Sequence, residues 1–404
     1  MSPYLFNLSP RRLGERVKKK VLFCANIHLH FKGFHLPVFQ WFQEQGWEVH
    51  AAANGKLELP YTDQVFEIPV QRSPFRLENV SAYHELLKLI NQHEYDIIHC
   101  HTPMGGMLAR LAAGKARKKG AKVIYTAHGF HFYKGAPKLN WLLYYPIERM
   151  LAHRTDCLIT INSEDYQLAL DRKLGAGRVV HVHGVGVDTE RFKPAEDSYK
   201  QELRNQHGFA PDDFLFFYAA EFNANKNQQL LIQALAYIKQ KVPGGRLLLA
   251  GEGPLLEHCR ALAAEMQIAD RVHFLGYRQD IASLLQMCDV AVGASYREGL
   301  PVNIMEAMAC GLPVIATANR GHTELVADEA NGFIVPLNDP WNFAVRMIRL
   351  NHAEPLRKRM AAESLRRVQT YSSLQVRQQL SEIYNVYIEE ETHASEAEYH
   401  HAYL

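Results

Sequence analysis

Residues 298–315 have the sequence EGLPVNIMEAMACGLPVI, which predicts a loop, a short helix, a turn and a buried strand. Pro301 suits the first helical position and Gly311 suits a left-handed helix stop, while the β-branched residues after Pro313 favour a strand. The apolar run at 290–292 predicts another parallel strand just before this unit. The helix should therefore begin at the carboxyl edge of a parallel sheet, which is where α/β proteins bind ligands.

Two carboxylates bracket this loop and helix. Glu298 precedes the flexible Gly299, and Glu306 follows on the helix itself. Successive backbone N–H groups at a helix start can hold an anion such as phosphate. A carboxylate can accept hydrogen bonds from two hydroxyls at once, which suits a sugar or ribose diol. A nucleotide sugar carries both kinds of group, although each glutamate taken singly is equally well explained as a solvated or capping carboxylate.

The segment as a whole resembles the E-x7-E signature of retaining glycosyltransferases of the GT-B fold, sequence family 4. The match extends from Asp289 through Pro313 to Gly321 and Glu324. The resemblance implies an α/β protein with two Rossmann-like, doubly wound parallel-sheet domains and a cleft between them. It also implies that the first glutamate acts in catalysis and the second holds the ribose of the donor. The donor contacts implied in this segment are Glu298, Gly299, Leu300, Pro301, Val302 and Glu306.

The composition limits the number of domains, the classes of partner and the expected location of the protein. The chain has 404 residues, 47% of them hydrophobic, which is enough for two cores. Its formal net charge is only +2, so nothing global favours nucleic acid as a partner. The six cysteines form no C-x-x-C pair and predict reduced thiols, not a disulfide framework or a zinc site. We find no secretory signal and no bilayer-length apolar run, so the expected location is the cytoplasm, with a peripheral position at the inner membrane face as a further option.

Strand and helix patterns alternate along both halves of the chain. After the strand at 21–25, a loop rich in His and Gly is expected up to residue 34, with Gly33 as a donor contact. Alternation over this length predicts a largely parallel sheet with helices on both faces. The expected division is a disordered basic segment at 1–18, an acceptor-binding domain at 19–193 and a nucleotide-sugar-binding domain at 197–370. The resemblance implies that the helix at 373–391 packs back on the first domain.

Several histidines fall at strand ends in the first half. Thr126-Ala127-His128-Gly129 resembles the Thr-x-His segment of the family, which implies that His128 lies beside the donor sugar near the reacting centre. For His28, His99 and His101, hydrogen bonding within loops is the ordinary interpretation. Their spacing is not that of a metal motif such as H-x-x-x-H, so we predict no metal site.

The second half carries a cation and a departure from the family pattern. Lys226 resembles the lysine of the G-R-x-x-x-x-K-G segment, which neutralises the donor diphosphate as the leaving group forms. Glu221 stands where the family usually has an arginine, and a carboxylate there repels a diphosphate unless it is turned away. Gly253 belongs to a G-x-G-P turn near the nucleotide. Tyr277 and Arg278 are either contacts to the base or ordinary loop residues.

No D-x-D pair occurs in the sequence. Lys226 and helix N-terminal amides are therefore expected to carry the charge of the diphosphate, without a metal ion and without a cofactor. The predicted activity is that of a metal-independent retaining hexosyltransferase, which moves a sugar from a UDP-sugar to a glycan or polyprenyl-linked acceptor in cell-surface polysaccharide synthesis. The alternatives are a non-catalytic scaffold subunit of the same fold and a nucleotide-sugar epimerase. The apolar stripe at 141–146 is expected to be core more than a membrane contact.

Overall fold

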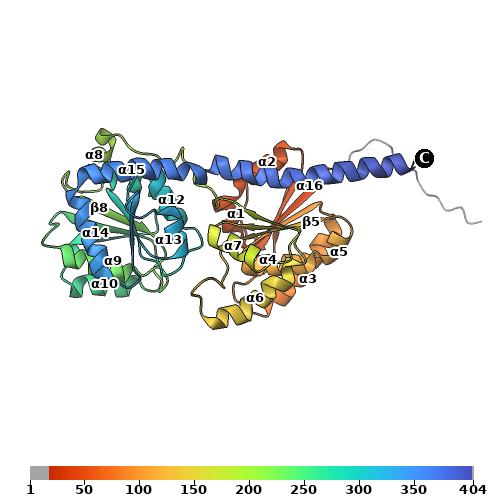
Figure 1. Cartoon of the computed structure of the whole chain (residues 1–404), viewed down its shortest axis with the longest axis horizontal. Helices are drawn as coiled ribbons and strands as arrows, with labels where there is room; N and C mark the ends of the chain where they lie inside the picture. Colours follow the sequence, from red (N-terminus) through yellow and green to blue (C-terminus); the bar gives the residue numbers. More distant parts are fainter. Residues whose placement is uncertain (1–17, 403–404) are drawn as a thin grey trace, which may run out of the picture.

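Two parallel sheets stand side by side in this protein, and helices cover both faces of each (Figure 1). The computed structural model describes residues 18–402, with side chains described as far as residue 389. The first sheet has seven strands in the order β3-β2-β1-β4-β5-β6-β7, and the second has six in the order β10-β9-β8-β11-β12-β13. This is the predicted GT-B architecture. Of the basic segment 1–18, expected to be disordered, all but Lys18 lies outside the described residues.

The elements have the following bounds. The strands of the first sheet are β1 (Lys20–Ile27), β2 (Glu48–Asn54), β3 (Gln64–Glu67), β4 (Ile97–His101), β5 (Lys122–Ala127), β6 (Cys157–Thr160) and β7 (Arg178–His181). Those of the second are β8 (Phe214–Ala219), β9 (Gly245–Ala250), β10 (Val272–Gly276), β11 (Val290–Gly293), β12 (Val314–Thr317) and β13 (Gly332–Val335). The helices of the first half are α1 (His28–Phe34), α2 (Leu36–Glu44), α3 (Glu78–His93), α4 (Pro103–Ala112), α5 (Gly114–Lys118), α6 (Lys138–Ala152) and α7 (Ser163–Asp171). Those of the second half are α8 (Asp197–Gln206), α9 (Gln228–Ile238), α10 (Leu256–Glu265), η1 (Ala269–Arg271), α11 (Ile281–Met287), α12 (Val302–Ala309), α13 (Arg320–Leu325), α14 (Pro340–His352), α15 (Glu354–Val368), η2 (Gln369–Tyr371) and α16 (Ser373–Ala402).

The strand order reverses once in each sheet. β1 lies between β2 and β4, and β8 lies between β9 and β11. At such a switch point the helices that follow neighbouring strands leave on opposite faces, which opens a crevice at the carboxyl ends of the strands. The loops after β1, β4, β8 and β11 therefore have room for a ligand.

Helix α16 runs along the first half of the molecule, while α15 lies over the second half (Figure 1). Helix α16 begins beside Val187, which pairs with Ser372, and then packs against α2. Tyr384 of α16 is 1% exposed, and its hydroxyl lies 2.7 Å from Nδ1 of His99 in β4. The ring of Tyr384 also stacks on Trp41 at 5.7 Å between centroids. The C-terminal helix thus completes the apolar core on one face of the first sheet.

The structure corrects the sequence prediction at three places. Residues 28–34 form the helix α1, not a loop, because Phe31 is fully buried against Phe39 and the core under β1. Pro301 is the N-cap of α12, one position before the predicted one, whereas Gly311 has the predicted left-handed φ of 73°. The edge strand β3 was not predicted, since its sequence QVFE is mostly exposed and carries no apolar run.

Candidate functional site

The loops after β8 and β11 are joined at the switch point of the second sheet. The backbone N–H of Tyr296 donates to the carbonyl of Asn225 at 2.8 Å, and the Asn225 side chain bonds the backbone of Arg297 in both directions. Lys226 and Glu298 come from these two loops, and Nζ of the lysine lies 2.5 Å from Oε1 of the glutamate. The ion pair is partly buried, with 23% and 14% of the two side chains exposed. An anionic ligand at this edge would compete with Glu298 for the ammonium group.

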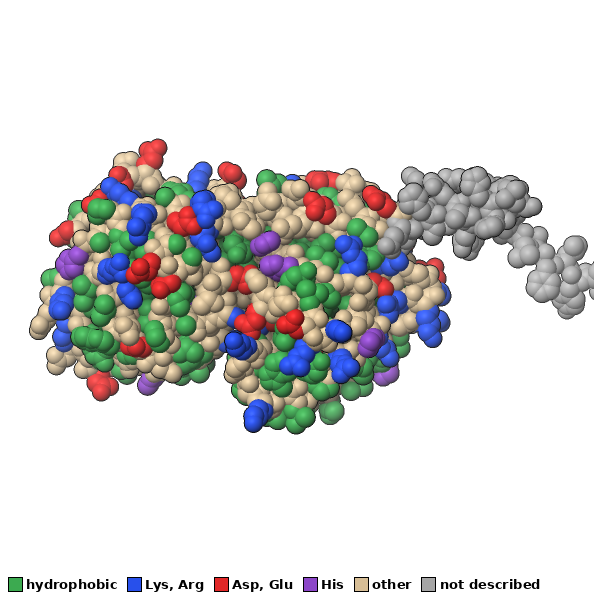
Figure 2. All heavy atoms as spheres, in the orientation of Figure 1, with side chains coloured by type: hydrophobic (Ala, Val, Ile, Leu, Met, Phe, Trp, Pro, Cys, Tyr) green, Lys and Arg blue, Asp and Glu red, His purple; other side chains and the backbone are tan. Residues whose placement is uncertain are grey.

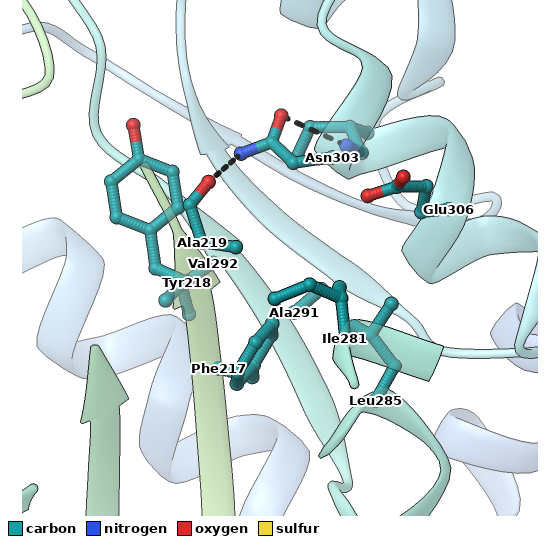
Figure 3. Close-up of a pocket in the computed structure, with 10 residues that line it drawn as sticks. Phe217, Tyr218, Ala219, Ile281, Leu285, Ala291, Val292, Asn303 and Glu306 are labelled. Carbon is teal, nitrogen blue, oxygen red and sulfur yellow. Dashed lines mark hydrogen bonds between the residues drawn. The ribbon is translucent and has the colours of Figure 1, made fainter. Parts of the chain in front are cut away.

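Glu306 lies on α12, one turn beyond Asn303. The Asn303 amide donates to the carbonyl of Ala219 at 3.0 Å and so ties α12 to the end of β8 (Figure 3). The structure gives the Glu306 carboxylate no hydrogen bond from within its described residues. Burial raises the pKa of Glu306 to about 7, and the charge of Arg191 only partly opposes this rise. A ligand that donates hydroxyl hydrogen bonds would stabilise the charged form of this carboxylate.

The two halves touch where the loops after β5 and β11 meet. A Cβ placed on Gly299 would lie 2.2 Å from the carbonyl oxygen of His128, and one placed on Gly129 would lie 3.3 Å from Cα of Gly299. Only glycine fits at residue 299 while this contact is kept. The backbone after Glu298 therefore lies directly against the His128 loop.

An arginine bridges the same two halves. Arg320 pairs with Asp165, donates through Nη2 to the carbonyl of Phe130 at 3.0 Å and through Nε to that of Glu298 at 3.2 Å. The Asp165 side chain is fully buried and that of Arg320 is 7% exposed. Burial raises the pKa of Asp165, and the Arg320 charge is the largest effect in the opposite direction. This ion pair therefore holds one particular arrangement of the two halves.

His128 belongs to a group of four histidines at the switch point of the first sheet. His30, His35 and His101 are the other members, and one ring nitrogen from each of the four lies within 4.8 Å of the rest. Burial lowers the pKa of His30 to about 4 and lowers the pKa of the other three as well. All four rings are therefore neutral near pH 7.

The other two strand-end histidines make internal hydrogen bonds. His28 Nε2 lies 3.1 Å from the carbonyl oxygen of Phe66. His99 bonds Tyr384 through one ring nitrogen and Thr126 through the other. Both are hydrogen-bonded within the protein as expected, although His28 lies on α1 and His99 in β4, not in loops.

The remaining predicted donor contacts lie around a groove of about 350 Å³ and the second-sheet loops. Gly33 lies in the last turn of α1 and lines this groove together with Glu306 and Val302. Gly253 has a φ of 150° and packs on the backbone of Phe222, so it supports the loop of Glu221.

Three of the residues predicted to contact the sugar donor have side chains that are exposed or bound to a neighbouring residue in the same loop. The exposed Glu221 carboxylate accepts a hydrogen bond from Asn223 at 3.1 Å. Tyr277 is 71% exposed, and Arg278 pairs with Asp280. Leu300, by contrast, is buried beneath the cleft, where a Cβ on Gly184 would clash with it at 2.8 Å.

Three charged residues at the site were not predicted. Arg297 and Arg320 both act on the half-buried His131, whose pKa they help to lower. Arg191 lines the same groove as Glu306, and its charge acts on that carboxylate. The sequence could have indicated two of them, since Arg297 directly precedes Glu298 and Arg320 directly precedes Gly321 of the matched segment. Which of these cations faces the cleft is decided by the packing of the two halves.

The prediction that the stripe at 141–146 is core is only half right. Trp141, Tyr144 and Tyr145 pack on the first core, but the other face of α6 is exposed. Its exposed apolar side chains are Leu139, Leu142, Leu143, Ile147 and Met150. Figure 2 shows hydrophobic side chains beside Lys and Arg over this part of the surface. No helix among the described residues is long and apolar enough to cross a bilayer.

Comparison with known proteins gives matches over both halves of the chain. The family model "Glycosyl transferases group 1" matches residues 199–367, and the model "Glycosyl transferase 4-like" matches residues 20–162. EpsD of Bacillus subtilis (strain 168), a protein provisionally named as a glycosyltransferase, is 49% identical over 374 residues, which cover 93% of this chain and 98% of EpsD.

More distant relatives include one with a named reaction and several solved structures. An Escherichia coli UDP-Gal:alpha-D-GlcNAc-diphosphoundecaprenol alpha-1,3-galactosyltransferase is 31% identical, covering 68% of this chain and 71% of the relative. HepE of Anabaena, solved with UDP and glucose, superposes with a TM-score of 0.75 at 22% identity, covering 91% of this chain and 100% of HepE. WaaG, involved in lipopolysaccharide biosynthesis, superposes with a TM-score of 0.71 at 18% identity, covering 90% and 99%.

Proposed function

This chain belongs to the group 1 glycosyl transferases, and we propose that it is a retaining hexosyltransferase that uses a UDP-sugar donor. The proposed acceptor is a glycan or polyprenyl-linked sugar in the synthesis of cell-surface polysaccharide. Support comes from EpsD and from the E. coli relative, whose name specifies a UDP-sugar and a diphosphoundecaprenol-linked acceptor. We assign acceptor binding to residues 19–193 and donor binding to residues 197–370.

One observation carries the proposal. At the second-sheet switch point, Lys226 and Glu298 form an ion pair, while Glu306 lies near the end of β8 and receives no hydrogen bond from the residues that the structure describes. A nucleotide sugar matches this set, because its diphosphate needs cations and its ribose hydroxyls need an acceptor. Glu298 then exchanges its ion pair for hydroxyls of the donor sugar, beside the loop of His128.

Stabilisation of the leaving diphosphate is assigned to Lys226, with Arg297 and Arg320 as neighbouring cations. Such preorganised donors stabilise the negative charge that develops on the departing phosphate in the transition state. Each is worth about 3 to 4 kcal/mol in comparable sites. Glu221 turns toward Asn223 and solvent, which lessens its repulsion of the diphosphate. The leaving phosphate is then the group that helps to deprotonate the acceptor hydroxyl on the same face of the sugar.

A release assay tests the proposed reaction. Purified protein is incubated with a panel of UDP-sugars and with synthetic polyprenyl-diphosphate-linked acceptors, and free UDP is measured. We expect UDP release that depends on the acceptor and is unchanged when Mg²⁺ or Mn²⁺ is added after chelator treatment. An epimerase would convert the sugar without releasing UDP, and a scaffold subunit would bind no donor. Either result would overturn the proposal.

We further propose that α6 contacts the membrane surface on which a lipid-linked acceptor resides. Its exposed apolar side chains are flanked by the exposed cations Lys138 and Arg149 of the helix and by Arg154 just after it. Such a face binds anionic lipid by apolar burial and charge together. Replacing Leu142 and Leu143 by Glu should abolish co-sedimentation with anionic vesicles while leaving thermal stability unchanged, because both side chains are exposed. Unaltered sedimentation would exclude this face as the contact.

A further inference from the structure

The histidine group of the first sheet is assembled from three separate segments. His30 lies on α1 after β1, and His35 lies at the junction of α1 and α2. His101 ends β4, and His128 follows β5. Every pair among the four rings has centroids between 4.1 and 6.3 Å apart. The rings therefore surround one point at the carboxyl edge of the sheet.

The nitrogen positions match those around a small metal ion. His30 Nε2 lies 3.1 Å from His35 Nε2, and His101 Nδ1 lies 3.4 Å from His128 Nε2. Four nitrogens at about 2.0–2.1 Å from a tetrahedrally coordinated ion are about 3.3–3.4 Å apart. The two close pairs are thus near the edge length of such a tetrahedron, and all four ligand nitrogens lie within 4.8 Å of one another.

Hydrogen bonding between the rings does not account for the whole cluster. The Nε2 atom of His101 is buried and has no hydrogen-bond partner within the described part of the chain. Nδ1 of His101 faces His128 and would ligate the ion, so the unpaired Nε2 would carry the proton of the neutral ring.

The chemistry of the donors selects the ion. The cluster offers only imidazole nitrogens, without a carboxylate. Imidazole suits Zn²⁺ and neighbouring transition metals, whereas Mg²⁺ and Ca²⁺ prefer oxygen. We propose that His30, His35, His101 and His128 bind one four-coordinate transition-metal ion of the zinc class. This site is separate from the diphosphate position at the second sheet and does not depend on the proposed transfer reaction.

An occupied site would have two structural consequences. It would fasten α1 to the ends of β4 and β5, and so fix one wall of the groove that Gly33 lines. It would also occupy a ring nitrogen of His128, at the loop that touches Gly299. The metal would therefore act at the boundary between the two halves of the cleft.

Metal binding is tested directly on the full chain without an affinity tag, after chelator treatment and gel filtration. Zn²⁺ is titrated by calorimetry, and Co²⁺ is titrated by visible absorption, because tetrahedral and octahedral Co²⁺ differ strongly in band intensity. We expect saturation at one ion per chain with a tetrahedral Co²⁺ spectrum and no response to Mg²⁺. His30→Ala and His101→Ala should each weaken binding by at least about tenfold.

His28→Ala is the matched control, since His28 lies on the same helix but outside the cluster, and it should bind as the wild type does. His30 is only half-buried, so His30→Ala keeps the test valid if His101→Ala does not fold, as judged by circular dichroism. Lack of saturable binding, an octahedral Co²⁺ spectrum, or equal affinity in wild type and folded His30→Ala would overturn the proposal.

Discussion

Donor affinity should depend on pH through Glu306. Its pKa of about 7 in the free protein reflects burial, with no hydrogen-bond donor to the carboxylate among the described residues. If ribose hydroxyls donate to the charged carboxylate, binding lowers that pKa, and the donor prefers the deprotonated protein. Affinity is then fully present above pH 7 and is lost as the pH falls below 7.

The size of the effect follows from the ionised fraction. A carboxyl with this pKa is about nine-tenths ionised near pH 8 and about 3% ionised near pH 5.5. The Kd for a UDP-sugar should therefore rise by about 30-fold as the pH falls from 8 to 5.5. This equals about 2 kcal/mol of binding free energy, at 1.36 kcal/mol per tenfold change in Kd. The cluster histidines do not contribute, because the pKa of His30 is about 4 and burial keeps those of His35, His101 and His128 well below their usual range.

Calorimetry with a UDP-sugar measures this dependence without interference from the ligand, because its diphosphate diester has no proton to lose in this range. Titrations near pH 7 in buffers of different ionisation enthalpy should show release of about half a proton per donor bound. Glu306→Gln keeps the side-chain shape and should bind about 10- to 100-fold more weakly at pH 8, with a flat pH profile. A flat wild-type profile, or an unchanged slope in Glu306→Gln, would refute the assignment of Glu306 to the ribose.

Three further changes test the site. Lys226→Ala should lower the turnover rate by about two to three powers of ten, because it removes the cation nearest the proposed leaving group; a loss below tenfold in UDP release would contradict this. Gly299→Ala brings a Cβ to 2.2 Å from the His128 carbonyl oxygen and should reduce turnover by about 10²-fold while leaving UDP affinity nearly unchanged. An equal loss of turnover and of UDP affinity would show that the loop shapes the donor site instead. Asp165→Ala leaves the buried Arg320 charge unpaired and should lower the free energy of unfolding by about 3–5 kcal/mol in urea, and an effect below 1 kcal/mol would mean that water reaches the arginine.

Much of the fold follows from local patterns. The apolar run at 290–292, for example, forms β11 (Val290–Gly293) as predicted, and the glycine stop after α12 has its predicted φ. Such elements are specified by residues close together in the chain, through burial periodicity and turn chemistry. The segment at 298–315 likewise places Glu298 and Glu306 at a sheet edge from its own residues. The glycine-containing segment at 28–34 was misjudged because the burial of Phe31, a tertiary contact, makes it helical.

The site itself was only partly predictable. Motif resemblance alone indicated Lys226 and His128, and the structure then placed the lysine beside Glu298 and the histidine loop against Gly299. The exposed apolar face of α6 could not be told from core, because an apolar stripe has the same spacing in both cases.

The amino-acid sequence by itself determined the alternation of strands and helices, the two-sheet architecture and the family of this protein. Only the tertiary structure decided that His30, His35, His101 and His128 surround one point, and that Arg320 reaches Asp165 in the other half. It also decided that burial raises the pKa of Glu306 to about 7. The physical reason is that these properties depend on which loops meet at the ends of parallel strands, and such neighbours are set by strand order and not by distance along the chain.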